Sequence, residues 1–271
     1  MDGQRELAQR FLALHEGDSP LLLANAWDEG SAKILRSAGF AALATTSSGF
    51  AATLGRGDYR VTREEAVAHA GAVAAASALP VSADFENCFA DDAEGIAQTV
   101  RAGREAGLAG CSIEDWDPAR GALYDIDVAA ERVRAAADAA HAAPVRLVLT
   151  ARAENHLRGN PDASDTIARL KAYENAGADV LYAPFFDSPQ DLHELLSVVT
   201  RPVNVLARAG APSVRELGEL GVKRVSVGGA FAFAAYGAAL EAARELRKDG
   251  TYGFAERSSA GARAAHEAFS G

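Results

Sequence analysis

Three acidic side chains stand where short apolar segments of the sequence end. Asp84 and Glu86 close the segment 80–86, and Glu114 closes the segment 110–115. Because side chains alternate along a strand, Asp84 and Glu86 point to the same face. Carboxylates that converge in a confined pocket have raised pKa values unless a cation neutralises them. An all-oxygen set suits Mg2+, or Mn2+, better than zinc, so we predict a metal site at Asp84, Glu86 and Glu114.

Two further groups could hold an anionic ligand beside this site. Arg152 and Glu154 share a face at the end of the segment that begins at residue 145. An arginine beside a metal site offers a fork for a carboxylate, although Arg152 could instead form a salt bridge with a neighbouring glutamate. The amides and hydroxyls of Ser47 and Ser48 would make an anion cradle, or only a polar turn.

The elements that must position these residues alternate along the chain. Eight apolar, β-branched runs are predicted to be strands, at residues 21–26, 41–46, 80–86, 110–115, 145–151, 179–183, 202–207 and 224–227. Between them lie stretches of helical periodicity at 63–77, 91–106, 127–142, 165–176, 190–199 and 214–220. Gly39, Gly107, Gly177 and Gly221 are placed to end helices.

This alternation predicts an α/β fold, a closed (β/α)8 TIM-type barrel rather than an open doubly wound sheet. In such a barrel the C-terminal ends of the strands form the active-site face, which is where the acids lie. Asp28 and Asp115 also follow predicted strands, but each could serve only as a helix N-cap. A Schiff-base aldolase barrel would need a lysine at an inward strand end, and none of the four lysines stands there: Lys33, Lys171, Lys223 and Lys248.

Composition limits the class of protein. The chain has 271 residues, of which 49% are hydrophobic and 24% charged, as in ordinary globular proteins. Its formal charge of -10 disfavours nucleic acid and anionic membranes as partners. Residues 1–16 lack an apolar signal core, and no run approaches the roughly 20 apolar residues of a membrane span. With only Cys88 and Cys111 there is no disulfide framework, so we expect a cytoplasmic protein.

The end of the sequence is longer than one barrel needs. We assign residues 1–250 to the barrel, with its last helix at about 230–248, and residues 251–271 to a C-terminal helical tail. Phe254 and Phe269 could pack on the same barrel or on a neighbouring subunit. We predict the second arrangement, a tail at a subunit interface.

Together the motifs resemble the isocitrate lyase/phosphoenolpyruvate (PEP) mutase superfamily, and most closely its phosphonomutase-like branch. The resemblance covers nearly the whole barrel. It is carried by Asn25-Ala26-Trp27-Asp28, Thr46-Ser47-Ser48-Gly49 through Leu54-Gly55-Arg56-Gly57-Asp58, Ala83-Asp84-Phe85-Glu86, Ser112-Ile113-Glu114-Asp115 and Thr150-Ala151-Arg152-Ala153-Glu154-Asn155.

The resemblance implies roles for individual residues. Asp84 would bind Mg2+ directly, and Glu86 and Glu114 would support the ion through water. Asp58 resembles an acid near the metal. The catalytic set would be Asp58, Glu154 and Arg152, with Asp58 or Glu154 as the proton carrier.

The substrate contacts are implied in the same way. A small 2-oxo acid or dicarboxylate would be held by Ser47, Ser48 and Arg152, with Trp27 and Asn204 also in contact. Related enzymes exchange their eighth helix between subunits, which implies a homodimer or homotetramer.

The sequence departs from the pattern in two loops. Lyases of the superfamily carry a Tyr-Asp pair where this chain has Trp27-Asp28, and a catalytic cysteine loop where it has residues 116–121. The Lys-Thr-Asn-Ser type of segment of the mutases is also missing. We predict a Mg2+-dependent enzyme that cleaves a C–C or P–C bond, or decarboxylates, through a metal-stabilised enolate of a 2-oxo acid. The alternative is a non-catalytic or near-inactive 2-oxo-acid binding protein that keeps the metal pocket.

Overall fold

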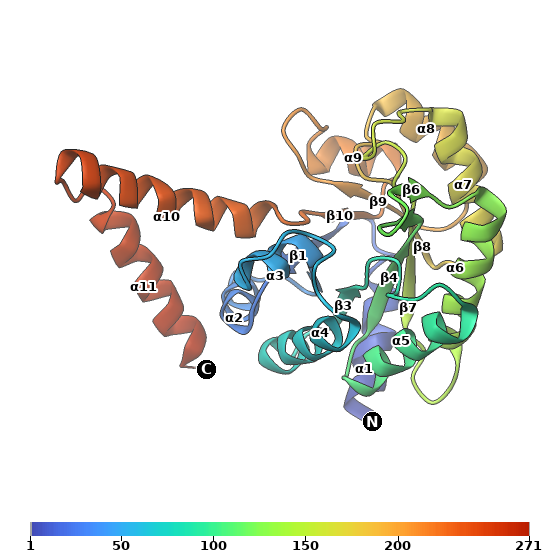
Figure 1. Ribbon diagram of the computed structural model, residues 1–271, viewed down its shortest axis with the longest axis horizontal. Helices are drawn as coiled ribbons and strands as arrows, with labels where there is room; N and C mark the ends of the chain where they lie inside the picture. The colour runs from blue at the N-terminus through green and yellow to red at the C-terminus, as the bar shows by residue number, and fades with distance from the viewer. Residues whose placement is uncertain (1, 271) are drawn as a thin grey trace.

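Eight parallel strands close into a barrel in the computed structural model, which describes residues 2–270 (Figure 1). Around the barrel the order is β1-β2-β3-β4-β7-β8-β9-β10, and β10 pairs with β1 to close it. The barrel strands are β1 (Leu21–Ala26), β2 (Leu43–Thr45), β3 (Val81–Asp84), β4 (Gly110–Glu114), β7 (Val148–Arg152), β8 (Val180–Tyr182), β9 (Val203–Leu206) and β10 (Arg224–Ser226). All eight predicted strands are therefore confirmed, and with them the TIM-type barrel.

Most helices connect successive strands and cover the outside of the barrel, whereas the last two extend beyond it (Figure 1). They are α1 (Asp2–Ala13), α2 (Glu29–Ser37), α3 (Ser47–Thr53), α4 (Arg63–Ser77), α5 (Ala93–Glu105), α6 (Ile126–His141), α7 (Ala163–Asn175), α8 (Pro189–Val198), α9 (Val214–Leu220), α10 (Ala230–Asp249) and α11 (Ala255–Phe269). The loop after β4 carries an antiparallel hairpin of β5 (Trp116–Asp117) and β6 (Ala122–Leu123), which the sequence analysis did not foresee.

Local sequence explains where the helices start and stop. Asp28 caps α2 and forms a capping box with Ser31. This confirms the N-cap role, one of the two roles considered for Asp28. Thr62 and Glu65 form the same box at the start of α4. The four predicted helix-ending glycines all have positive φ angles, between 92° and 107°.

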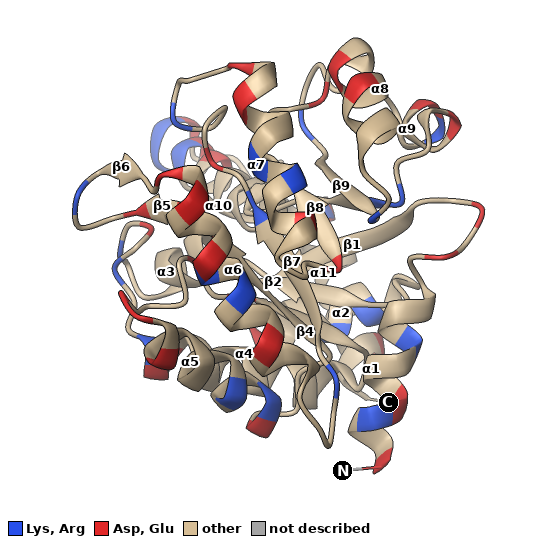
Figure 2. Cartoon of the chain, turned by 90° about the vertical axis from the view of Figure 1, so that its right-hand side faces the viewer, with Lys and Arg blue, Asp and Glu red and all other residues tan. Residues whose placement is uncertain are grey.

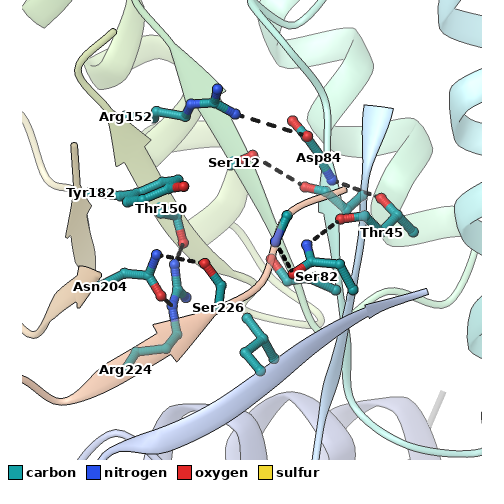
Figure 3. Close-up of a pocket in the computed structure, with 15 residues that line it drawn as sticks. Thr45, Ser82, Asp84, Ser112, Thr150, Arg152, Tyr182, Asn204, Arg224 and Ser226 are labelled. Carbon is teal, nitrogen blue, oxygen red and sulfur yellow. Dashed lines mark hydrogen bonds and ion pairs between the residues drawn. The ribbon is translucent and has the colours of Figure 1, made fainter. Parts of the chain in front are cut away.

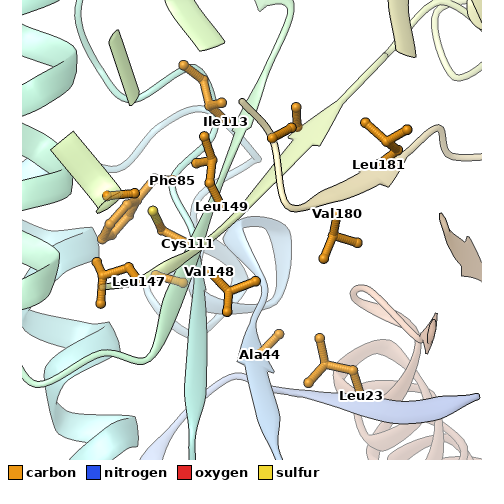
Figure 4. Close-up of a cluster of buried hydrophobic side chains, with 14 of the residues drawn as sticks. Leu23, Ala44, Phe85, Cys111, Ile113, Leu147, Val148, Leu149, Val180 and Leu181 are labelled. Carbon is orange, nitrogen blue, oxygen red and sulfur yellow. The ribbon is translucent and has the colours of Figure 1, made fainter. Parts of the chain in front are cut away.

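The apolar core lies between the strands and the surrounding helices. Along β4 and β7, Cys111, Ile113 and Leu149 alternate with the polar Ser112 and Thr150, so that one set packs in the apolar cluster and the other lines the barrel interior (Figure 4). The interior is thus polar toward the end that carries the predicted site. Acidic and basic side chains are interspersed on the helices α4, α5 and α6 (Figure 2).

The last two helices leave the barrel and return to it. α10 extends away from the strands, and α11 runs back to pack against α2, where Nζ of Lys33 lies 5.8 Å from the ring centre of Phe269 (Figure 1). Large apolar side chains along α10 remain exposed, among them Phe233, Tyr236 and Leu240. No described helix, α10 included, is both long enough and apolar enough to span a membrane.

Candidate active site

Three predicted site residues meet at the C-terminal ends of three adjacent strands, and Figure 3 shows two of them, Asp84 and Arg152. Asp84 ends β3, Glu114 ends β4 and Arg152 ends β7. Asp84 and Arg152 line a cavity of about 60 Å3 that continues inward between the strands. The register of parallel strands places them there, because equivalent ends of neighbouring strands lie at the same rim.

Arg152 is the centre of an ion-pair network. Its Nε pairs with Oε1 of Glu154, and its Nη1 lies 3.5 Å from Oε2 of Glu114 and 4.0 Å from Oδ2 of Asp84. Burial raises the pKa of Glu114 well above its usual range, and the Arg152 guanidinium opposes that rise. The salt-bridge role left open for Arg152 is therefore present in the structure, and the hydrogen bond from Nε to Glu154 is the only one its side chain makes to a described residue.

Glu154 is fully buried between two arginines. Its second oxygen lies 2.9 Å from Nη2 of Arg158, one helical turn further along the chain. Arg158 also donates to the hydroxyl of Tyr59, which in turn donates to Oε1 of Glu114. Glu154, Arg158, Tyr59 and Glu114 therefore form a continuous polar chain that fixes Arg152 from both sides.

Glu86 and Asp58 form no ion pair among the described residues, although both lie within the influence of Arg152. Burial, with the nearby Asp84 and Asp58 carboxylates, raises the pKa of Glu86 to about 8. Its buried Oε1 has no hydrogen-bond partner in the structure. Loss of surrounding water and the Asp84 carboxylate also raise the pKa of Asp58, which stands at the rim of the site beside Ser47.

The loop that carries Glu86 is held in an unusual backbone conformation. Glu86, Cys88 and Phe89 have φ angles of 49°, 62° and 53°, in the left-handed region that favours glycine. Arg132 of α6 donates to the carbonyl oxygens of Asn87, Ala90 and Asp91 at 2.8, 2.7 and 3.1 Å. The outer helix therefore imposes the loop shape that directs Glu86 toward the site.

The donor set fits a hard divalent ion held largely through water. No three His, Cys, Asp or Glu side chains among residues 2–270 form a compact cage. Asp84 stands at the cavity, and the orphaned Oε1 of Glu86 and the buried Glu114 lie in the same acidic cluster. One direct carboxylate with others around it suits Mg2+, which keeps several of its waters and shares oxygen ligands with the substrate.

The residues predicted to contact the substrate do not all lie at the cavity. The Ser47 amide donates to Oδ2 of Asp84 at 3.2 Å, and Ser47 and Ser48 begin α3, so the polar turn, one of the two readings left open for them, is wrong. Asn204 lines the cavity deeper in the barrel. The structure does not bring Trp27 into that cavity, because its side chain is half-buried against α3 near Gly49.

Asp115 has a structural role other than the N-cap left open by the sequence. Its Oδ1 accepts the Glu154 amide at 2.8 Å, and its Oδ2 pairs with Arg169 and Tyr173 of α7. It therefore fixes the end of β7 to α7. Among the lysines, Nζ of Lys223 donates to Gly17 at the opposite face of the barrel, as expected for a residue outside the site.

Sequence reasoning missed several polar residues of the site. Tyr59 directly follows Asp58, and Arg158 stands four residues after Glu154, a spacing that permits an ion pair. Tyr182 ends β8 and lines the cavity, so the rule that strand-end residues face the site would have found it. Tyr59 and Tyr182 therefore stand near the site, although neither comes from the segment after β1.

Comparison with known proteins identifies the family of this chain. The family described as phosphoenolpyruvate phosphomutase matches residues 11–247. The chain belongs to this family. It is a member of the isocitrate lyase/PEP mutase superfamily, as the sequence motifs predicted.

Relatives of this family member extend over most of its length. A Burkholderia cenocepacia J2315 protein described as a lyase/mutase has a solved structure with a TM-score of 0.91 and 47% identity, covering 94% of this chain and 93% of that one. An uncharacterised Mycobacterium tuberculosis protein is 36% identical over 87% of this chain and 88% of its own. The 2-methylisocitrate lyase of Halalkalibacterium halodurans is 28% identical over 74% of this chain and 67% of its own. The family thus consists of lyases and mutases, and an enzymatic role follows for this chain.

Proposed function

We propose that this PEP mutase family member is a Mg2+-dependent lyase or mutase that breaks a bond next to the carbonyl of a small 2-oxo acid. The observation that carries the proposal is the meeting of Asp84, Glu114 and Arg152 beside the unpartnered carboxyl of Glu86. The relative named 2-methylisocitrate lyase supports a carboxylate substrate. When bound, Mg2+ supplies Lewis-acid stabilisation of the negative charge that develops on the substrate carbonyl oxygen.

Arg152 binds and orients the substrate in this proposal. Its Nε and Nη1 are held by Glu154, Glu114 and Asp84, so the guanidinium plane is fixed before the substrate arrives. Nη2 makes no hydrogen bond to a described residue, and in this proposal it donates to the substrate carboxylate. Ionised donors give the stronger class of hydrogen bond, which suits a guanidinium that must discriminate an acid from a neutral ligand.

Asp58 is a better proton carrier than Glu154. Glu154 is fully buried and forms ion pairs with both Arg152 and Arg158, so it serves to position Arg152. Asp58 stands at the rim, and its pKa is raised by loss of water and by Asp84. A carboxyl group whose pKa moves toward the working pH is the more effective general acid or base.

Calorimetric titration with Mg2+ and a 2-oxo acid tests the metal assignment. We expect Asp84→Asn to abolish Mg2+-dependent binding of the acid, because this variant removes the direct ligand. Asp187→Asn is the matched control, since Asp187 follows another barrel strand, β8, but pairs with Arg208 outside the cavity. Unchanged affinities in Asp84→Asn would contradict the proposal.

Turnover assays across a panel of 2-oxo acids separate catalysis from binding. We expect at least one acid to be consumed with Mg2+, and Asp58→Asn to lower kcat while leaving binding nearly intact. Mg2+-dependent binding without turnover of any acid would instead establish the non-catalytic alternative, which the altered loop at residues 116–121 keeps open.

A further inference from the structure

His69 is a half-buried histidine that takes no part in the proposed mechanism. It stands in the middle of α4, where it is the only polar side chain between Glu65 and Ser77. Its ring stacks on Phe50 of α3, with the ring centres 3.9 Å apart and the planes within 6° of parallel. The stack restrains the plane of the imidazole, and with it the direction in which Nε2 points.

Two buried polar atoms at one small cavity lack a hydrogen-bond partner among residues 2–270. They are Nε2 of His69 and Oε1 of Glu86. Both residues line the same cavity, which Asp84 also lines. Only 4% of Glu86 is exposed, so bulk solvent does not compensate its oxygen. A buried polar atom without a hydrogen bond is costly, and the few found in native proteins require an explanation.

Other polar side chains at this cavity do have partners. The Thr45 hydroxyl accepts from the backbone amide of Asp84 at 2.9 Å (Figure 3). The Thr46 hydroxyl accepts from the amide of Gly49 at 3.3 Å, and Oδ2 of Asp84 accepts from the amide of Ser47 at 3.2 Å. The two unpartnered atoms are therefore exceptions within a cavity whose polar groups are otherwise bonded.

The size of the cavity indicates what can lie between the two atoms. Its volume of about 10 Å3 corresponds to about one water molecule. Burial lowers the pKa of His69 to about 4, so the ring is neutral near neutral pH and one of its nitrogens is a hydrogen-bond acceptor. Because a water both donates and accepts, it can bond to Nε2 whichever nitrogen carries the proton, and to a carboxyl oxygen at the same time.

We propose that His69 is a positioning residue, which holds the carboxyl group of Glu86 through a single buried water. With one oxygen bonded at the cavity, rotation of the carboxyl group is restricted and both oxygens keep a fixed direction. A carboxyl oxygen accepts more than one hydrogen bond, so the same oxygen can still serve the water shell of a metal. Residues that orient the groups around a metal in this way change its affinity roughly 10–100-fold when mutated. The effect on Mg2+ rests on the proposed function, whereas the water bridge does not.

A crystal structure of the metal-free full chain tests the bridge directly. We expect one ordered water at about 2.7–3.2 Å from both Nε2 of His69 and Oε1 of Glu86. In crystals of His69→Phe, which keeps a ring on Phe50 but has no ring nitrogen, we expect this water to be lost. A direct contact between His69 and Glu86, or no ordered density in the cavity at a resolution that shows other buried waters, would overturn the inference.

Calorimetric titration with Mg2+ alone measures what the bridge contributes to the metal site. We expect His69→Phe to weaken binding by at least about tenfold, and His69→Gln, whose amide can bond to the water, to stay within about threefold of wild type. His193→Phe is the control, because His193 is exposed on α8 and lies outside the cavity. Unchanged affinity in His69→Phe, or an equal loss in His69→Phe and His69→Gln, would refute the positioning role.

A double-mutant cycle shows whether His69 acts through Glu86. Glu86→Met removes the oxygen to which the water would bond, so we expect His69→Phe to weaken Mg2+ binding by less than about threefold when it is added to Glu86→Met. The same tenfold loss in both backgrounds would mean that His69 acts by another route, and would refute the inference. If wild type binds no Mg2+ while its crystals contain the bridging water, the proposed function fails and the bridge stands.

Discussion

Replacing Arg152 by alanine removes a cation that contacts three carboxylates at the mouth of the barrel. Glu154 pairs with its Nε, and Glu114 and Asp84 lie 3.5 and 4.0 Å from its Nη1. Only 16% of the Arg152 side chain is exposed, and the side chains of Glu154 and Glu114 are almost fully buried. The variant therefore leaves buried negative charge uncompensated, beyond any effect on substrate.

The magnitude follows from the burial of these pairs. Breaking a buried ion pair by removing one partner costs about 3–5 kcal/mol, whereas exposed pairs contribute about 1 kcal/mol or less. Because Glu154 and Glu114 are buried, we expect the higher range for Arg152→Ala. A loss of that size lowers Tm by roughly 6–20 °C in a domain of this size class.

Urea unfolding of metal-free protein near pH 8 and near pH 5.5 measures this loss. Arg152 lowers the pKa of Glu114, so its removal raises that pKa further above the value in the unfolded chain. The folded variant then binds more protons than the unfolded chain, and its stability falls as pH rises. We expect the deficit of Arg152→Ala to be larger near pH 8. Arg208→Ala is the control, because Arg208 makes a two-point pair with Asp187 but is 35% exposed.

Two results would refute this reasoning. A free energy of unfolding within about 1 kcal/mol of wild type near pH 8 would show that Arg152 does not compensate the carboxylates. A deficit that does not change with pH would show that lost packing, not lost charge, is responsible. In the first case Arg152→Ala becomes a clean probe of substrate binding alone.

Two further predictions concern pH and assembly. Glu86 has a pKa raised to about 8, so the stability it contributes in the protonated form is lost as the pH rises from the usual pKa range of a glutamate through about 8. Glu86→Gln should therefore flatten the dependence of the free energy of unfolding on pH in metal-free protein. An unchanged dependence would exclude Glu86 as its source. The exposed apolar side chains of α10, including Phe233 and Leu240, predict that α10 and α11 pack on a second subunit, as in the exchanged helix implied by the resemblance. Sedimentation should then give a dimer or tetramer, and a full-length monomer at micromolar concentration would contradict the exchange.

The barrel was predictable because its signals repeat. Each apolar run of about five residues was correctly predicted to be a strand, and α4 and α9 were predicted at their observed bounds. α3 was missed because Ser47, Ser48 and Gly49 favour a turn, and the helix forms with Thr46 as its N-cap. The hairpin β5–β6 escaped because each strand has two residues, too few to show alternation.

The candidate site was predictable only where it follows strand ends. Asp84, Glu114 and Arg152 stand at the last positions of their strands, so register alone brings them together. Tyr59 reaches Glu114 from a loop 55 positions earlier, and no local pattern encodes that approach. Arg224, which lines the cavity with Asp84 and Arg152, lies at the start of β10, and residues at that end of a barrel strand usually serve stability. A rule that looks for site residues only at the C-terminal ends of strands therefore overlooks it.

The loop that carries Glu86 is not a portable module. Its left-handed residues Glu86, Cys88 and Phe89 each cost on the order of 1–3 kcal/mol and persist only where surrounding contacts overdetermine the backbone. Here the contacts come from Arg132 on α6 and from Thr99 on α5, whose hydroxyl donates to the Cys88 carbonyl oxygen at 2.7 Å. A designer who grafts this loop onto another barrel must transplant both helices with it. Without them the loop would not keep its backbone conformation, and the glutamate would not point toward the site.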